Sequence, residues 1–279
     1  MDEERKILFL MSVPRSGSTV VQDHLAAKLE GAITAPETWF IPFALAARSE
    51  LSFSPIGLGA ARLAEDQFGI RVFDKHIFVG IESFFSSMLD AVPGAKIFVE
   101  KTPRNVFYNK EISAFLPKAL KVILVRHPID IALSSFSYFC HGRPNLAKVS
   151  IDLHEGIDAV ADIVRSGEAI LVRYEDFIAD NGKTLREGLC KAGLAICETN
   201  SLYEDTVLRQ SRLGDTNFKA TKSVNGANSY KYGTTKISFI MYLVLSGLLK
   251  RESYRYVLET LYDLPPEDLS RVLRKNVNR

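Results

Sequence analysis

Residues 7–19, ILFLMSVPRSGST, decide the fold into which the rest of the chain must fit. Residues 7–13 are nearly all apolar without strict alternation, which predicts a short strand covered on both faces, as in a parallel sheet. A polar turn follows at 14–19, and apolar residues then recur at helical spacing until Gly31. A strand, a tight turn and a helix direct backbone N–H groups to one point, which favours a bound phosphate or sulfate.

This turn differs from the standard nucleotide-triphosphate loop, G-x-x-x-x-G-K-[ST]. Ser12 stands at the first Gly position and Ser18 at the Lys position, so that the cation of the turn is Arg15. A forked guanidinium can grip a planar or tetrahedral oxyanion with two N–H bonds. The alternative is an ordinary strand–turn–helix corner with a serine as helix cap.

The composition is that of an ordinary globular protein: 279 residues, 47% hydrophobic and 24% charged, with room for a full α/β core. A net charge of +2 and the lack of an aromatic and basic stripe argue against nucleic-acid binding. Three scattered cysteines fit neither a disulfide framework nor a zinc site and favour a reducing compartment. Because the charged N-terminus does not resemble a signal peptide, we expect a cytoplasmic protein.

The longest apolar stretch, 237–249, is too short to span a bilayer. We expect a buried helix there, with an interfacial helix as the alternative, and no transmembrane segment. We expect no metal, because no His, Cys and Asp cluster has the spacing of metal ligands. The oligomeric state cannot be read from the sequence.

A short apolar run ends in charge four times along the chain, and a helical pattern follows each time. After the first run, we expect strands at 96–99, 121–125 and 169–172, and helices at about 104–116, 128–140, 175–180 and 183–193. This alternation predicts an α/β fold of the P-loop type, with three layers and a central, mostly parallel sheet flanked by helices. Ligands of such sheets bind outside the carboxyl ends of the strands.

We expect one domain, composed of a nucleotide-binding core at 5–180, an insertion at about 32–94 and a mostly helical completion at 181–279. The insertion should begin with a loop at 32–39 and include a helix at 77–90. Its aromatic residues either shape a substrate site or belong to the core. In the C-terminal part, the stretch 214–232 is polar.

A second anion-binding pattern follows the strand at 121–125. Arg126 stands just past that strand and Ser134 eight residues later, six past Pro128. Six helical residues advance roughly 9 Å, so a phosphate beside the helix could be held by the arginine on one side and the hydroxyl on the other. The alternative is an ion pair between Arg126 and Asp130.

Taken together, these segments resemble the sulfotransferases that use 3′-phosphoadenosine 5′-phosphosulfate (PAPS), in particular bacterial members and the tyrosyl-protein and carbohydrate branch. The 5′-phosphosulfate loop of that family is similar to VPRSGST at 13–19, and its 3′-phosphate motif to RHPIDIALS at 126–134. The resemblance also covers EKTP at 100–103, RYED at 173–176 and, more weakly, PETW at 36–39 and LGDTNF at 213–218.

The resemblance implies transfer of a sulfuryl group from PAPS to a hydroxyl, less commonly an amine, with adenosine 3′,5′-bisphosphate (PAP) as product. The donor-binding residues that it implies are Arg15, Ser16, Gly17, Ser18 and Thr19 for the 5′-phosphosulfate, and Arg126 and Ser134 for the 3′-phosphate. Lys101 would add a second cation and Glu100 would be the general base. The alternative role of Glu100 is an ion pair with Lys101 or Arg104; adjacent residues of an extended segment point to opposite sides.

The chain departs in two ways from the cytosolic members of that family, and two rival functions stay open. The cytosolic small-molecule members carry Lys where this chain has Arg15, and their histidine base aligns with no residue here; a share of the base role stays open for His76 and for His127, which is expected to be a helix-entry residue. The rival functions are a P-loop kinase using ATP and magnesium, and a non-catalytic protein that binds PAP or another nucleotide. The acceptor stays open among small molecules, carbohydrates, lipids, peptides and carrier-bound chains.

Overall fold

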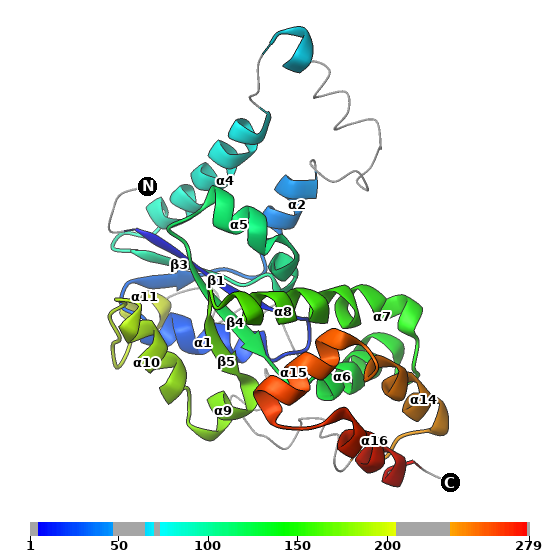
Figure 1. The fold of residues 1–279 in the computed structure, drawn as a ribbon. Helices are drawn as coiled ribbons and strands as arrows, with labels where there is room; N and C mark the ends of the chain where they lie inside the picture. The colour runs from blue at the N-terminus through cyan, green and yellow to red at the C-terminus, as the bar shows by residue number, and fades with distance from the viewer. Residues whose placement is uncertain (1–4, 47–64, 70–72, 205–234, 278–279) are drawn as a thin grey trace.

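The structure is a computed structural model that describes residues 5–46, 65–69, 73–204 and 235–277. The polar stretch 214–232 and the LGDTNF segment lie outside the described residues. The strands are β1 (Lys6–Ser12), β2 (Ala32–Thr34), β3 (Ile97–Glu100), β4 (Leu120–Val125) and β5 (Ile170–Arg173). They form one sheet in the order β2-β3-β1-β4-β5, and all neighbouring strands are parallel, which confirms the predicted fold class (Figure 1).

Helices follow the strands at nearly the predicted positions. They are α1 (Ser18–Lys28), α2 (Phe40–Ala46), α4 (Phe73–Asp90), α5 (Asn109–Phe115), α6 (Pro128–Cys140), α7 (Leu146–Leu153), α8 (Glu155–Ser166), α9 (Tyr174–Ala179), α10 (Lys183–Lys191), α11 (Ser201–Glu204), α14 (Phe239–Leu248), α15 (Glu252–Tyr262) and α16 (Pro266–Lys275). Because all the strands are parallel, the turns that follow them lie at the same edge of the sheet. The predicted site residues, which follow the strands in sequence, therefore gather at that edge.

One prediction of local structure was wrong, and another was confirmed with a difference in helix type. The segment 32–39 was expected to be a loop, but its first residues form β2, which pairs with β3 through Ala32 opposite Ile97 and Thr34 opposite Val99. Three residues are too few to show the periodicity of a strand, and pairing with β3 decides their conformation. The helix expected at 104–116 begins as a 3₁₀ helix, η1 (Pro103–Tyr108), before α5 continues it, as is common at helix starts.

The sheet is covered on both faces, as the apolar first strand predicts. Leu8 and Leu10 of β1 pack with α1, α9 and α10, whereas Phe9 and Met11 face a larger cluster built from α4, α6, α8 and the C-terminal helices. Because successive side chains of a strand alternate between faces, a strand buried on both sides must be apolar throughout.

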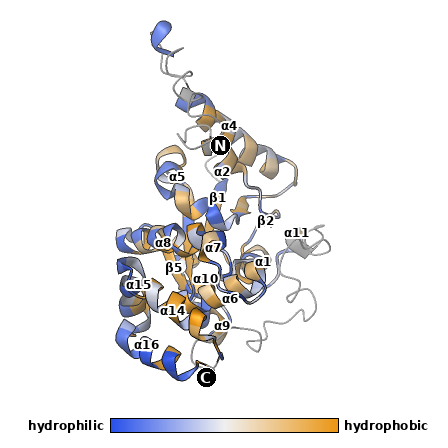
Figure 2. Cartoon of the chain, turned by 90° about the vertical axis from the view of Figure 1, so that its right-hand side faces the viewer, coloured by the Kyte–Doolittle hydropathy of each residue, from blue (hydrophilic) through white to orange (hydrophobic). Residues whose placement is uncertain are grey.

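The C-terminal apolar stretch forms α14, which is buried along one side only. Met241, Leu245 and Leu248 are buried, whereas Phe239 and Ile240 are among the exposed apolar residues of the chain. Figure 2 shows α14 in the orange of hydrophobic residues. The expected buried helix is therefore confirmed for one side of α14. None of the helices in the described ranges is long and apolar enough to cross a membrane.

Candidate active site

The turn between β1 and α1 has the conformation of an anion-binding loop. The Ser16 N–H donates to the Val13 carbonyl over 3.2 Å, and Arg15 and Gly17 adopt left-handed backbone angles, with φ of 73° and 88°. The N–H groups at the start of α1 lack intrahelical acceptors, as at any helix start. The buried Ser16 hydroxyl also has no hydrogen-bond partner within the described residues. Polar hydrogens thus converge on this turn, which fits a bound oxyanion.

Gly17 is required at its position for two reasons. Its positive φ is costly for a residue with a side chain. In addition, a Cβ atom on Gly17 would lie 2.3 Å from Cε2 of Tyr174, far inside van der Waals contact. The ring of Tyr174, from the RYED segment at the end of β5, therefore packs directly on the loop. This close approach is not visible in the sequence of either segment.

The Arg126–Ser134 motif contacts the turn at 14–19 through hydrogen bonds. Arg126 Nη1 donates to the Arg15 carbonyl over 3.1 Å, and Arg15 Nε donates to Ser134 Oγ over 3.3 Å. Arg126 and Ser134 are both buried. The guanidinium of Arg126 is thus directed to the loop, in place of the alternative ion pair with Asp130. The structure brings both predicted anion sites into one hydrogen-bonded cluster.

Two aromatic rings support the arginines of this cluster. The Arg15 guanidinium lies 4.2 Å from the ring centre of Tyr138, and that of Arg126 lies 5.0 Å from the ring centre of Tyr174. Tyr138 follows Ser134 by four residues on α6, so both contact Arg15 from one helix face. Sequence reasoning missed Tyr138; its spacing from Ser134 is the signal that could have found it.

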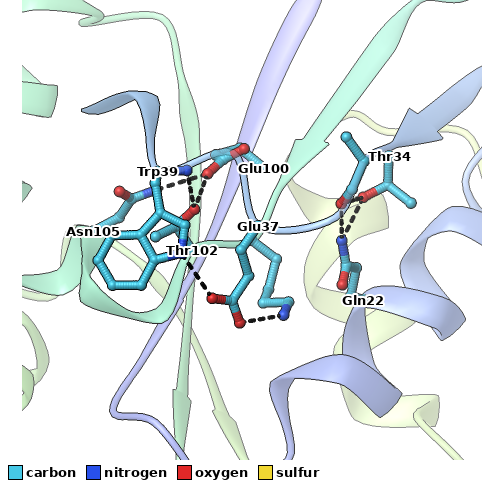
Figure 3. A network of polar contacts seen from close by, with 9 residues as sticks. Gln22, Thr34, Glu37, Trp39, Glu100, Thr102 and Asn105 are labelled. Carbon is cyan, nitrogen blue, oxygen red and sulfur yellow. Dashed lines mark hydrogen bonds and ion pairs between the residues drawn. The ribbon is translucent and has the colours of Figure 1, made fainter. Parts of the chain in front are cut away.

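Glu100 lies buried at the end of β3, opposite Phe9 of β1, and is only 1% exposed. The Thr102 hydroxyl donates to its Oε1 over 2.7 Å and the Asn105 amide over 3.2 Å (Figure 3). Burial raises the pKa of Glu100, and hydrogen bonds from Thr102, Thr38 and Asn105 oppose that rise. The raised pKa makes the carboxylate a stronger base than an exposed glutamate.

Arg104 and Lys101, the two cations with which Glu100 was alternatively expected to pair, form ion pairs with other carboxylates. Arg104 forms a two-pronged ion pair with Asp152, at 3.0 and 3.2 Å. Lys101, with 3% of its side chain exposed, pairs with Glu37 at 2.8 Å. Glu100 and Lys101 therefore contact different groups, as alternation along an extended segment predicts.

Glu37 is a candidate site residue that sequence reasoning missed. Its Oε1 accepts from Lys101 Nζ, and its Oε2 accepts from Trp39 Nε1 over 3.2 Å (Figure 3). With 35% of its side chain exposed, Glu37 is far more accessible than Glu100. The signal for it was the PETW trait at 36–39, to which no role was assigned.

The two candidate histidines occupy different surroundings. His127 is buried against the ring of Tyr262, and burial, with Arg126 and Arg173 nearby, lowers its pKa to about 3. It is therefore neutral at physiological pH. His76 is exposed on the first turn of α4. A role for either as the base stays a hypothesis.

This constellation of an anion-binding loop, a second arginine and a buried carboxylate on a parallel sheet agrees with comparisons to known proteins. The chain belongs to the sulfotransferase family, whose family model matches residues 8–196. The family match confirms the predicted resemblance and supports sulfuryl transfer as the class of reaction.

One curated relative is the nodulation protein NoeE of Sinorhizobium fredii (strain NBRC 101917 / NGR234), 29% identical over 130 residues. That match covers 46% of this chain but only 30% of NoeE. The chain therefore matches less than a third of that protein's length.

Similar solved structures include two sulfotransferase domains. That of the curacin biosynthetic pathway has a TM-score of 0.58 at 18% identity and covers 94% of this chain and 99% of its own. That of the Synechococcus PCC 7002 olefin synthase has a TM-score of 0.52 at 21% identity, with 85% and 91% covered. A sulfotransferase from Alicyclobacillus acidocaldarius has a TM-score of 0.51 at 13% identity, covering 95% and 98%. At these identities the likeness shows the fold alone.

The burial of Glu100 predicts a defined dependence of stability on pH. Because its pKa is raised above 4.5 in the folded protein, the fold binds that proton more tightly than the unfolded chain does. The resulting stability is complete below pH 4.5 and is lost as pH rises through the folded-state pKa. Glu100→Gln cannot ionise, so the unfolding free energy of the wild type minus that of the variant should fall with rising pH. Urea denaturation at several pH values measures this difference; a difference that is constant or grows with pH contradicts the prediction.

Proposed function

We propose that this protein transfers the sulfuryl group of PAPS to a hydroxyl, less commonly an amine, of its acceptor. The observation that carries the proposal is the cluster at the turn between β1 and α1, in which hydrogen bonds link Arg126 to Arg15 and Arg15 to Ser134. Such a cluster suits a nucleotide with negative groups at both its 3′ and 5′ positions. Each arginine fork can bind one of them by charge-assisted hydrogen bonds.

Each group would have a distinct task in the reaction. PAPS supplies an activated sulfuryl group, which passes to the acceptor by in-line displacement, by analogy with phosphoryl transfer. Arg15, the Ser16 hydroxyl and the N–H groups of 17–19 would hold the 5′-phosphosulfate and neutralise charge on the leaving phosphate oxygen, because the Ser16 N–H already donates to the Val13 carbonyl. Arg126 and Ser134 would hold the 3′-phosphate. Lys101, which pairs with Glu37, would add a second cation.

Two carboxylates are proposed as acceptors of the proton that the acceptor hydroxyl releases. Glu100 has the raised pKa that favours proton uptake, but Thr102 and Asn105 occupy its Oε1 and it is almost inaccessible. Glu37 is accessible and lies against Lys101. A base must come within hydrogen-bond reach of the proton that it removes, so access favours Glu37 and basicity favours Glu100.

Three further expectations are part of this proposal: one domain over the whole chain, a cytoplasmic location, and an acceptor that is a small molecule, carbohydrate, lipid or carrier-bound chain. The rival kinase lacks support because Ser18 stands where an ATP loop has its lysine. A non-catalytic protein that binds PAP would keep the cluster but show no turnover with any acceptor.

Donor identity is tested by thermal shift. PAP without divalent metal should raise the melting temperature, because a ligand that binds only the folded state stabilises it. ATP with magnesium should raise it much less. A larger shift with ATP and magnesium than with PAP contradicts the PAPS proposal and supports a kinase.

The 3′-phosphate site is tested by removing its cation. Arg126→Ala should weaken PAP binding by roughly 2 kcal/mol or more, the scale of a charge-assisted hydrogen bond, and Ser134→Ala should weaken it less. Adenosine 5′-phosphosulfate lacks that phosphate, so calorimetry should show a smaller loss for it in both variants. Equal losses for the two nucleotides would assign Arg126 and Ser134 to the fold or to another ligand.

The proton acceptor is tested by comparing Glu100→Gln with Glu37→Gln. The variant that lacks the true base should lose about 10²- to 10⁴-fold in turnover while keeping its affinity for PAP. Slow hydrolysis of PAPS to PAP provides an assay before an acceptor is known. Near-normal turnover in both folded variants would remove both glutamates from the chemistry and direct attention to His76 and His127.

A further inference from the structure

Glu175 joins the start of α6 to the C-terminal helix α15. Its Oε1 accepts the backbone N–H of His127 over 3.0 Å, and its Oε2 accepts the hydroxyl of Tyr262 over 2.9 Å. His127 is the N-terminal capping residue of α6, and its own side chain makes no capping bond. Glu175, from α9, therefore provides the capping acceptor that the helix start needs.

Tyr262 is held in place from several directions. Its ring meets that of His127 edge to face at 5.1 Å, and the Arg173 guanidinium lies 4.7 Å from its centre. Burial, followed by the charge of Glu175, raises the pKa of Tyr262 above its ordinary value. The phenol therefore stays protonated and donates to Glu175.

The peptide group that Glu175 binds is the one that links Arg126 to His127. Fixing this peptide fixes the direction in which the Arg126 side chain leaves the backbone. Tyr174, the residue before Glu175, supports the same side chain through its ring. Two consecutive residues of the RYED segment thus act on Arg126, one on its backbone and one on its guanidinium.

We infer that Glu175, held by the Tyr262 hydroxyl, is a positioning residue that orients Arg126 for the 3′-phosphate of the donor. The inference rests on the proposed function, since it concerns the same donor site. It gives the C-terminal helices a role in donor binding, although the family match ends at residue 196 and Tyr262 lies beyond it. Figure 1 shows α15 next to α6, in agreement with their packing.

The test uses Tyr262→Phe, which removes one hydroxyl and keeps the ring. Calorimetry should compare PAP with adenosine 5′-phosphate, since these differ only in the 3′-phosphate. The variant should bind PAP about 3- to 10-fold more weakly, the scale of one lost hydrogen bond, with little change for adenosine 5′-phosphate. Glu175→Ala should lose more than Glu175→Gln, which keeps one acceptor oxygen.

Tyr254→Phe is the matched control. Tyr254 is a fully buried tyrosine of the same helix, and its hydroxyl donates to the Leu153 carbonyl over 2.7 Å. Its loss should lower the melting temperature but leave the ratio of PAP affinity to adenosine 5′-phosphate affinity unchanged. A merely structural role of Tyr262 would give the same result as this control.

The outcomes separate the inference from the proposed function. Wild-type protein that binds PAP, with an unchanged affinity ratio in Tyr262→Phe and Glu175→Ala, overturns the positioning role alone. Equal losses for both nucleotides in these variants overturn it too, because they indicate general loosening of the fold. Wild-type protein that fails to bind PAP overturns the proposed function and this inference with it.

Discussion

The hydrogen bond from Arg126 to the Arg15 carbonyl is the constraint on which the rest of the site depends. It links the ends of β1 and β4, which lie side by side in the sheet with Ser12 opposite Leu124. Parallel neighbours end at the same edge, so one strand can deliver an anion-binding turn and the next a cation to stabilise it. A left-handed residue such as Arg15 is unfavourable in isolation, and a bond to its carbonyl opposes that cost.

The same bond brings two guanidinium groups to one turn, and their repulsion needs compensation. The rings of Tyr138 and Tyr174 provide part of it, since an aromatic face attracts a cation without neutralising it. If PAPS is the donor, as proposed, its two negatively charged groups would oppose this repulsion further.

The sequence predicted what local patterns determine, and missed what long-range contacts determine. The strand β4 and the helix α6 were predicted from an apolar run and a following Pro128, because burial on both faces and helix starts leave local signals. Helices α7 and α8 had no prediction, and β2 is too short for a periodic signal. The pair of Lys101 and Glu37 spans 64 residues of sequence, so only the fold reveals it. Glu100 was located correctly at a strand end, but its burial was not foreseeable, because it depends on tertiary contacts such as that with Asn105 of η1.

The ion pair between Lys101 and Glu37 would change during catalysis if Glu37 is the base. A buried ammonium is costly unless a negative group faces it, and in this structure that group is Glu37. If Glu37 takes up the proton of the acceptor, Lys101 loses its partner at the moment when the leaving phosphate gains negative charge. The lysine would then be attracted to the leaving group, and proton transfer would be coupled to stabilisation of the transition state. Glu100 is coupled to Lys101 more weakly, because its Oε1 is bound by neutral donors from Thr102 and Asn105 and the charge of Lys101 has the smallest of the effects on its pKa.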